Sequence, residues 1–83
     1  MTITIYTTRT CPFCKMEKEY LDSKNIQYEE ILVDERPEEA QKMIAMSGQL
    51  GVPFTVIKKE DSQEEKILGF DKARIDQILQ ISS

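Results

Sequence analysis

Two cysteines, Cys11 and Cys14, are the residues of this sequence whose type and spacing are best suited to chemistry. They are its only cysteines, and it has no histidine. A disulfide between them would close a very short loop and remove little entropy from the unfolded chain, so it would be a poor structural staple. A zinc site within the chain would need further Cys or His ligands, and a c-type haem site would need His where Lys15 stands. The pair therefore predicts thiol–disulfide chemistry.

The place of the pair in the chain predicts a different role for each sulfur. An alternating, β-branched strand over residues 3–6 precedes it, and Pro12 suits the first turn of a helix that runs to about Lys24. The free N–H groups and partial positive charge of a helix N-terminus favour a thiolate at Cys11. Cys14, one turn into the helix, is expected to be more buried. We expect Cys11 to attack a disulfide and Cys14 to resolve the mixed intermediate, and the alternative of two inert buried thiols fits this placement less well.

The rest of the chain predicts an α/β fold around this pair. Further strands are expected over residues 26–33, 53–57 and 66–68, with one helix from Pro37 to a C-cap at Gly48 and another after an N-cap at Asp71. The element order is β-α-β-α-β-β-α. The first two strands are expected to pair in parallel through a right-handed crossover, and the last two to form an antiparallel hairpin. The result is a four-stranded mixed sheet flanked by three helices.

Apolar residues at helical spacing predict which side of each helix faces the core. The expected core-facing residues are Met16, Tyr20 and Leu21 in the first helix, Ala40, Met43, Ile44 and Met46 in the second, and Ile75, Ile78 and Leu79 in the third. We interpret Met43 and Met46 as core residues rather than ligands, and the charged run 58–61 as a solvated turn. Ser82 and Ser83 are expected to fray.

Length and charge narrow the classes of function. The chain of 83 residues is expected to form one domain, residues 1–83. Its net charge of −4 supplies no basic face, which argues against a nucleic-acid or anionic-membrane binder. Its apolar runs are too short to span a membrane. The N-terminal residues do not resemble a signal peptide, so we expect a cytoplasmic protein whose thiols are kept reduced. We also expect the protein to be a monomer.

Four short segments of the chain suggest a known family. They are ITIYT at 3–7, TCPFC at 10–14, GVP at 51–53 and LGFD at 68–71. With this spacing, which holds over nearly the whole chain, the sequence resembles the glutaredoxins. The resemblance implies the thioredoxin fold and a thiol–disulfide oxidoreductase that donates electrons to protein disulfides or to glutathione-mixed disulfides. It implies no bound cofactor, with glutathione as a co-substrate and disulfide-containing proteins as partners.

The same resemblance assigns binding residues around the two cysteines. It implies a cis Val52–Pro53 peptide bond that faces the cysteines, with the backbone of Val52 pairing with the substrate. It also implies that Gly69 and Asp71 bring the N-terminus of the last helix and a carboxylate to the γ-glutamyl end of glutathione. The helix dipole makes physical sense of an anion site at that place.

The residues between and before the cysteines include further binding candidates and two departures from the family pattern. Pro12 and Phe13 are candidates for the substrate-binding surface, and Phe13 offers either an apolar contact to partners or a cover over the site. Thr8 stands where many glutathione-using members carry Lys, and Arg9 is expected to take over its role. Leu68 takes the place of the first of two family glycines.

The sequence leaves the reductant open between glutathione and thioredoxin reductase. The segment LGF at 68–70 resembles an element of redoxins that take electrons from thioredoxin reductase, and such redoxins include donors to ribonucleotide reductase. A further alternative is an iron–sulfur module in which two chains hold a cluster through Cys11 and glutathione. Pro12 argues against that module, because cluster-binding members generally carry a small residue there. A redox-sensing regulator ranks last, because the sequence has no additional domain to transmit a signal.

Glu17 lies one helical turn after Cys14 and has two interpretations. A buried carboxylate at this place would be able to accept the proton of Cys14. Glu is rarely buried without a partner, so the sequence favours a solvated residue on the helix surface.

Overall fold

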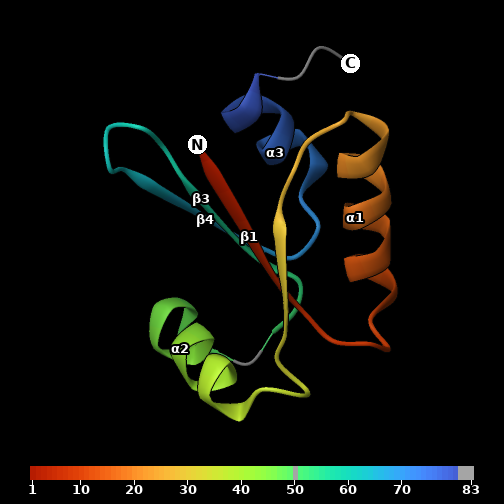
Figure 1. Cartoon of the computed structure of the whole chain (residues 1–83), viewed down its shortest axis with the longest axis vertical. Coiled ribbons are helices and arrows are strands. Elements are labelled where there is room, and N and C mark those ends of the chain that lie inside the picture. The colour runs from red at the N-terminus through yellow and green to blue at the C-terminus, as the bar shows by residue number, and fades with distance from the viewer. Residues whose placement is uncertain (50, 81–83) are drawn as a thin grey trace.

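Strands and helices alternate along the chain in the predicted order. The computed structural model describes residues 1–49 and 51–80 (Figure 1). The elements are β1 (Thr2–Thr7), α1 (Pro12–Ser23), β2 (Glu29–Leu32), α2 (Pro37–Ser47), β3 (Phe54–Lys58), β4 (Glu64–Leu68) and α3 (Lys72–Leu79). The predicted order β-α-β-α-β-β-α is therefore confirmed. The expected fraying of Ser82 and Ser83 lies outside the described residues.

The strands form one mixed sheet in the order β2-β1-β3-β4. β1 pairs in parallel with β2, whereas β3 pairs antiparallel with both β1 and β4, as the crossover and the short hairpin turn predict. Because β1 and β3 run in opposite directions, Tyr6 near the end of β1 lies opposite Phe54 at the start of β3. The loop after β1 and the segment before β3 consequently meet at one end of the sheet.

Helices cover both faces of the sheet, with α1 and α3 on one face and α2 on the other (Figure 1). The alternation of side chains along a strand divides the core between these faces. Leu21 of α1 and Ile75 of α3 pack with Ile5 and its neighbours on the first face. Met43 of α2 packs with Val56 and its neighbours on the second.

Two helix residues and two strand ends differ from the sequence prediction. Met16 and Ile44 were expected in the core, but they are 49% and 40% exposed. The buried stripe of α1 consists of Cys14, Glu17 and Leu21, so Met16 lies off it, and in α2 Met43 occupies the core in place of Ile44. β2 is shorter than expected because residues 26–28 do not pair in the sheet, although Ile26 and Tyr28 pack against the core. β4 is longer because its pairing with β3 extends back to Glu64.

The ends of the helices match the residues predicted to form them. Gly48 ends α2 with a left-handed φ of 80°, a conformation that glycine adopts without steric cost. Asn25 follows α1 with a φ of 58°. Asp71 caps α3, because its side chain accepts a hydrogen bond from the Arg74 N–H at 3.1 Å. The predicted cap residues of α2 and α3 are therefore confirmed.

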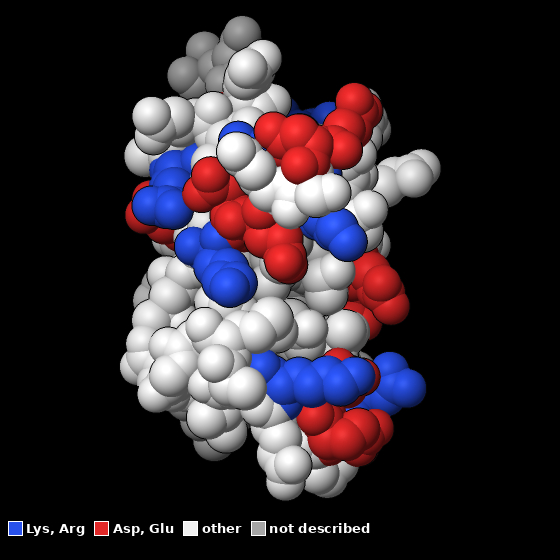
Figure 2. Space-filling view, turned by 90° about the vertical axis from the view of Figure 1, so that its left-hand side faces the viewer, with Lys and Arg blue, Asp and Glu red and all other residues white. Residues whose placement is uncertain are grey.

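Charged side chains are mixed in sign on the face shown in Figure 2, where basic groups lie beside acidic ones. Arg74 and Lys59 both pair with Glu65, at 3.3 and 3.9 Å. Among the described residues, no helix is long and apolar enough to cross a membrane.

Candidate active site

Cys11 is the residue at which the loop after β1 becomes helix α1. It is the N-cap of α1, with an extended backbone, and Pro12 follows in the first helical turn. The Cys14 N–H donates a hydrogen bond to the Cys11 Sγ at 3.2 Å. A sulfur that receives a backbone N–H at a helix N-terminus is in a position that stabilises negative charge. The Cys11 side chain is half-buried, which leaves its sulfur accessible to a disulfide.

Cys14 has a different environment, although it lies only one turn further along α1. Its side chain is 1% exposed, and both thiols are free. Burial, together with a hydrogen bond to Cys11 and the nearby charge of Glu17, raises the pKa of the Cys14 thiol to about 12. The predicted difference in burial between the two cysteines is confirmed, and Cys14 is held as a neutral thiol beneath Cys11.

The segment before β3 lies directly beside Cys11. The Val52–Pro53 peptide bond is cis. The Val52 carbonyl oxygen lies 3.8 Å from the Cys11 Sγ. The predictions that this bond is cis and that it lies beside the cysteines are therefore confirmed.

Gly69 is joined to this segment through the backbone. The Gly69 N–H donates to the Pro53 carbonyl at 2.8 Å, and Gly69 has a left-handed φ of 79°. Asp71, two residues later, is exposed, and one of its carboxylate oxygens caps α3. The structure thus brings Pro53 and Gly69 together and places the carboxylate of Asp71 at the N-terminus of α3.

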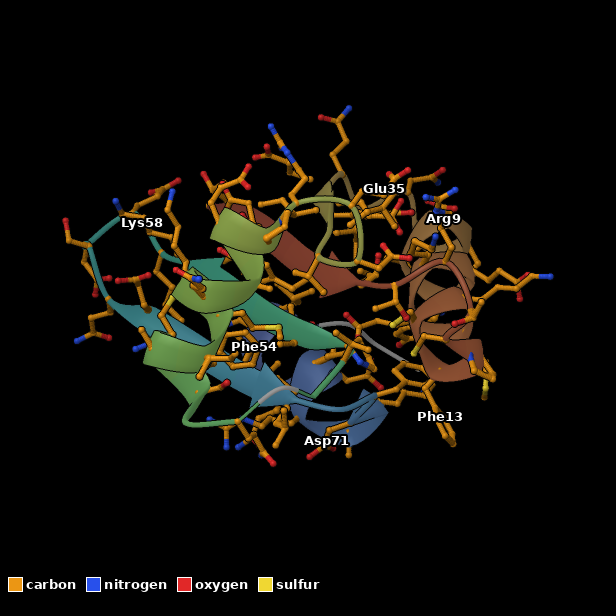
Figure 3. The ribbon with its side chains drawn as sticks, turned by 90° about the horizontal axis from the view of Figure 1, so that it is seen from below. Arg9, Phe13, Glu35, Phe54, Lys58 and Asp71 are labelled. Atoms are coloured by element: carbon orange, nitrogen blue, oxygen red, sulfur yellow. The ribbon has the colours of Figure 1, made fainter. Side chains whose placement is uncertain are left out.

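Arg9 forms ion pairs that its position in the sequence did not reveal. Its guanidinium lies 2.6 Å from Glu35 and 3.7 Å from Asp34, and its backbone N–H donates to the Asp34 carboxylate at 3.3 Å. Figure 3 shows Arg9 and Glu35 side by side. A free carboxylate ligand would therefore compete with two resident carboxylates for this guanidinium.

Exposed apolar side chains and a groove lie near the segments that carry Cys11 and Val52. Phe13 is 59% exposed and projects outward from the start of α1, which leaves most of its ring available to a partner (Figure 3). Leu68 is 47% exposed and lies close to Gly51, in the segment before Pro53. A groove of about 490 Å³ is lined by Thr8, Val33, Asp34, Pro37, Ala40 and Val52.

Glu17 is the site residue that the sequence interpretation assigned wrongly. It is fully buried, at 0% exposed, whereas a solvated helix-surface position was favoured. The Thr55 hydroxyl donates to the Glu17 Oε2 at 2.5 Å. Burial raises the pKa of the Glu17 carboxyl, and the hydrogen bond from Thr55 opposes this in part. The spacing of Cys14, Glu17 and Leu21 along one side of the helix was the available signal.

Comparison with known proteins identifies close relatives in sequence. The family model for glutaredoxin matches residues 3–61. An uncharacterized glutaredoxin-like 8.6 kDa protein from the rubredoxin operon of Clostridium pasteurianum is 42% identical over 94% of this chain and 97% of its own length. The glutaredoxin-like protein NrdH of Lactococcus lactis is 41% identical over 71% of this chain and 78% of its own length.

Comparison with solved structures agrees with the sequence matches. The NrdH-redoxin of Escherichia coli, a glutaredoxin-like protein described as having a thioredoxin-like activity profile, superposes with a TM-score of 0.75 at 28% identity. The match covers 100% of this chain and 97% of that one. The thioredoxin-like fold expected from the sequence is therefore confirmed. A matching family model over most of the chain, together with a relative of this identity and coverage, shows that the chain belongs to the glutaredoxin family.

Proposed function

We propose that this glutaredoxin-like redoxin is an electron donor that reduces protein disulfides and glutathione-mixed disulfides through Cys11 and Cys14. The observation that supports this most directly is the contrast between the two sulfurs. Cys11 is accessible and receives a backbone N–H at the start of α1, whereas Cys14 is buried with a pKa of about 12. An accessible sulfur can attack a substrate disulfide, and a buried thiol next to it can then attack the resulting mixed disulfide.

The proposed reaction has two steps. The Cys11 thiolate attacks one sulfur of the substrate disulfide, so a Cys11–substrate bond forms while the second substrate sulfur leaves as a thiolate. Cys14 then loses its proton and attacks the Cys11 sulfur, which forms the Cys11–Cys14 disulfide and releases the first substrate sulfur. The substrate gains two electrons and the redoxin loses two. A reductant must afterwards return the two electrons.

Substrate docking is proposed at Val52, Pro53, Pro12 and Phe13. The Val52 carbonyl oxygen, 3.8 Å from the Cys11 Sγ, is close enough for an extended substrate strand to pair with it while its sulfur reaches Cys11. The exposed ring of Phe13 adds an apolar contact on the helix side of the sulfur.

Single cysteine variants test this assignment. Cys11→Ser removes the attacking thiolate and should abolish reduction of a small synthetic disulfide. Cys14→Ser should leave a stable mixed disulfide on Cys11 that mass spectrometry detects. Alkylation of the reduced protein below about pH 7 should label Cys11 first, because the thiolate is the reactive form. Labelling of Cys14 before Cys11 would show that the roles are reversed.

For the reductant, we propose thioredoxin reductase as the main source of electrons and glutathione as a weak one. Arg9, the candidate for a glutathione carboxylate, already pairs with Glu35 and Asp34. The exposed apolar side chains of Phe13 and Leu68 suit a protein partner. The similarity to NrdH proteins, one of which is described as having a thioredoxin-like activity profile, supports the same choice.

A direct comparison of two reducing systems tests this choice. The oxidised protein is supplied with NADPH and either thioredoxin reductase or glutathione with glutathione reductase, and NADPH consumption is followed. Faster reduction by thioredoxin reductase is expected. Faster reduction by the glutathione system would make Gly69 and Asp71 the centre of a glutathione site, with Arg9 exchanging its partners for the ligand.

A further inference from the structure

Glu17 is a fully buried acid on the same helix face as Cys14. The two residues are three positions apart on α1, a spacing at which Cβ atoms are about 5–6 Å apart. Neither side chain is exposed by more than 1%. The Thr55 hydroxyl fixes Glu17 from the sheet through its hydrogen bond to Oε2 at 2.5 Å. The carboxyl group is thus held on the inner side of α1, next to the buried thiol.

The second oxygen of Glu17 has no hydrogen-bond partner among the described residues. Within residues 1–49 and 51–80, the buried Oε1 makes no hydrogen bond. A buried carboxyl oxygen without a partner costs free energy whether the group is ionised or protonated. An apolar side chain at this position would avoid that cost, so packing does not account for a glutamate here.

Cys14 is the titratable side chain beside Glu17 on the buried face of α1. The buried side chains on this face do not titrate: they are Ile3, Ile5 and Thr7 of β1, Thr55 and Ile57 of β3, Ile67 of β4 and Ile75 of α3. The titratable side chains on the same face are Tyr20 and Tyr28, which are only partly buried, and Glu65 of β4, which pairs with Lys59 and Arg74. Glu30 of β2, which lies opposite Ile5, pairs with Lys18, and its carboxylate accepts from the Thr7 hydroxyl at 2.8 Å.

We propose that Glu17 accepts the proton of Cys14 when Cys14 resolves the mixed disulfide, and returns it when the Cys11–Cys14 disulfide is reduced. This inference rests on the function proposed above. In the resolving step, the S–H bond of Cys14 breaks, its proton passes to the Glu17 carboxylate, and its electron pair forms the bond to the Cys11 sulfur. The Cys11–substrate bond breaks, and its electron pair leaves with the substrate thiolate. In the reverse step, protonated Glu17 gives its proton to the departing Cys14 thiolate.

The acidities of the two groups suit this exchange. In the dithiol form the pKa of Cys14 is about 12, and burial is the first cause of that rise. Burial persists when Cys11 is bound to a substrate, so it still favours the protonated thiol of Cys14 near neutral pH, and resolution without a base would be slow. Burial raises the pKa of Glu17 above its ordinary value, which makes its carboxylate a stronger base than an exposed glutamate. The hydrogen bond from Thr55 opposes that rise and favours the ionised form.

A stopped-flow experiment can measure attack by Cys11 and resolution by Cys14 as separate phases, and only resolution is proposed to involve Glu17. Reduced protein is mixed with 5,5′-dithiobis(2-nitrobenzoic acid) in a stopped-flow instrument. Attack by Cys11 releases the first nitrothiobenzoate, and resolution by Cys14 releases the second. Both phases are measured from about pH 6 to about pH 9, a range that brackets the operating pH of a general base. The variants are Glu17→Gln, which can still accept from Thr55, and Glu17→Asp, which keeps a carboxylate.

Glu19→Gln is the matched control, because Glu19 lies on the same helix with its side chain exposed. In Glu17→Gln the second phase should slow by about 10²-fold near neutral pH, and its rate should rise with pH throughout the range. The first phase should not change. Glu17→Asp should recover part of the loss, and Glu19→Gln should match the unaltered protein. A second phase in Glu17→Gln with the original rate and pH profile overturns the proton role and leaves the proposed function standing. Loss of the first phase in the unaltered protein overturns both.

A measurement on the unaltered protein covers the case in which Glu17→Gln does not fold. The ¹³C resonance of the Glu17 carboxyl carbon is titrated in the dithiol and disulfide forms. If the thiol and the acid exchange a proton, the Glu17 midpoint should differ between the two forms. Identical titrations in both forms overturn the inference.

Discussion

Replacing Thr55 by Val isolates the hydrogen bond that holds Glu17. Thr55 is 1% exposed and is the second residue of β3, where a β-branched side chain of the same shape fits without opening a cavity. The substitution removes only the donor to the Glu17 Oε2, and it leaves a fully buried carboxyl with no hydrogen bond from its observed partner. The expected effect is therefore the cost of a buried polar group that loses its partner.

That cost is about 1–3 kcal/mol of the free energy of unfolding. For a domain of this size, each kcal/mol lowers the melting temperature by about 4–8 °C. Urea denaturation near neutral pH measures the change, and Thr4→Val on the opposite face of the sheet is the matched control. A double-mutant cycle with Glu17→Gln should show that the two positions are coupled, because both substitutions change one hydrogen bond.

The pH dependence of stability supplies a second check on the same pair. The folded-state pKa of Glu17 is raised above its ordinary value of 4.5, so the native protein keeps a proton there at pH values where the unfolded chain has lost it. The Glu17 contribution to stability is therefore present below pH 4.5 and decreases as the pH rises from there through the folded-state pKa. Glu17→Gln removes this dependence, so its stability should decline less over that window. If Thr55→Val costs no more than Thr4→Val, and Glu17→Gln keeps the original pH slope, then Glu17 is not held and buried as described.

Two further predictions concern the proposed glutathione contacts. Arg9→Ala should weaken the proposed glutathione-dependent activity by about ten-fold, the value of a charge-assisted hydrogen bond. Glu35→Gln weakens the 2.6 Å pairing of the Arg9 guanidinium and should raise that activity; activity unchanged in both variants would remove Arg9 from the site. Asp71→Ala should cost about 1 kcal/mol of the free energy of unfolding through loss of the α3 cap, whereas Asp71→Asn should keep the cap. If the carboxylate of Asp71 binds glutathione, both Asp71 variants should lose the chemical-shift response of Val52 and Gly69 to millimolar glutathione, and a retained response in either one would contradict that role.

The order of the elements could be predicted from the sequence because each boundary has a local signal. Pro12 and Pro37 begin helices, Gly48 ends one, and Asp71 caps another, all as expected from residue type. The different environments of the cysteines followed from the same kind of local reasoning, since the N-cap position of Cys11 depends only on the strand and helix around it. Each of these features depends on interactions between residues that are close together in the sequence.

The ion-pair partners of Arg9 and the burial of Glu17 could not be predicted from neighbouring residues in the sequence. Arg9 meets Glu35 because parallel pairing of β1 with β2 brings the loops after both strands to the same end of the sheet. Glu17 is buried because α1 turns its Cys14 side towards β3, where Thr55 supplies a donor thirty-eight positions away in the chain. The general rule that Glu is solvated was overridden by a tertiary contact.

β3 connects the substrate side of the proposed site with its buried side. Immediately before this strand, the Val52 carbonyl lies 3.8 Å from the attacking sulfur, and the Pro53 carbonyl accepts from Gly69. Two residues after Pro53, the side chain of Thr55 holds Glu17 on the inner side of α1. The strand thus positions the proposed docking backbone relative to Cys11 and the proposed proton acceptor relative to Cys14. A shift of β3 along β1 would disturb both sulfurs at once, which gives a physical reason why the Cys-Pro-Phe-Cys segment alone would not reproduce the chemistry proposed for the folded chain.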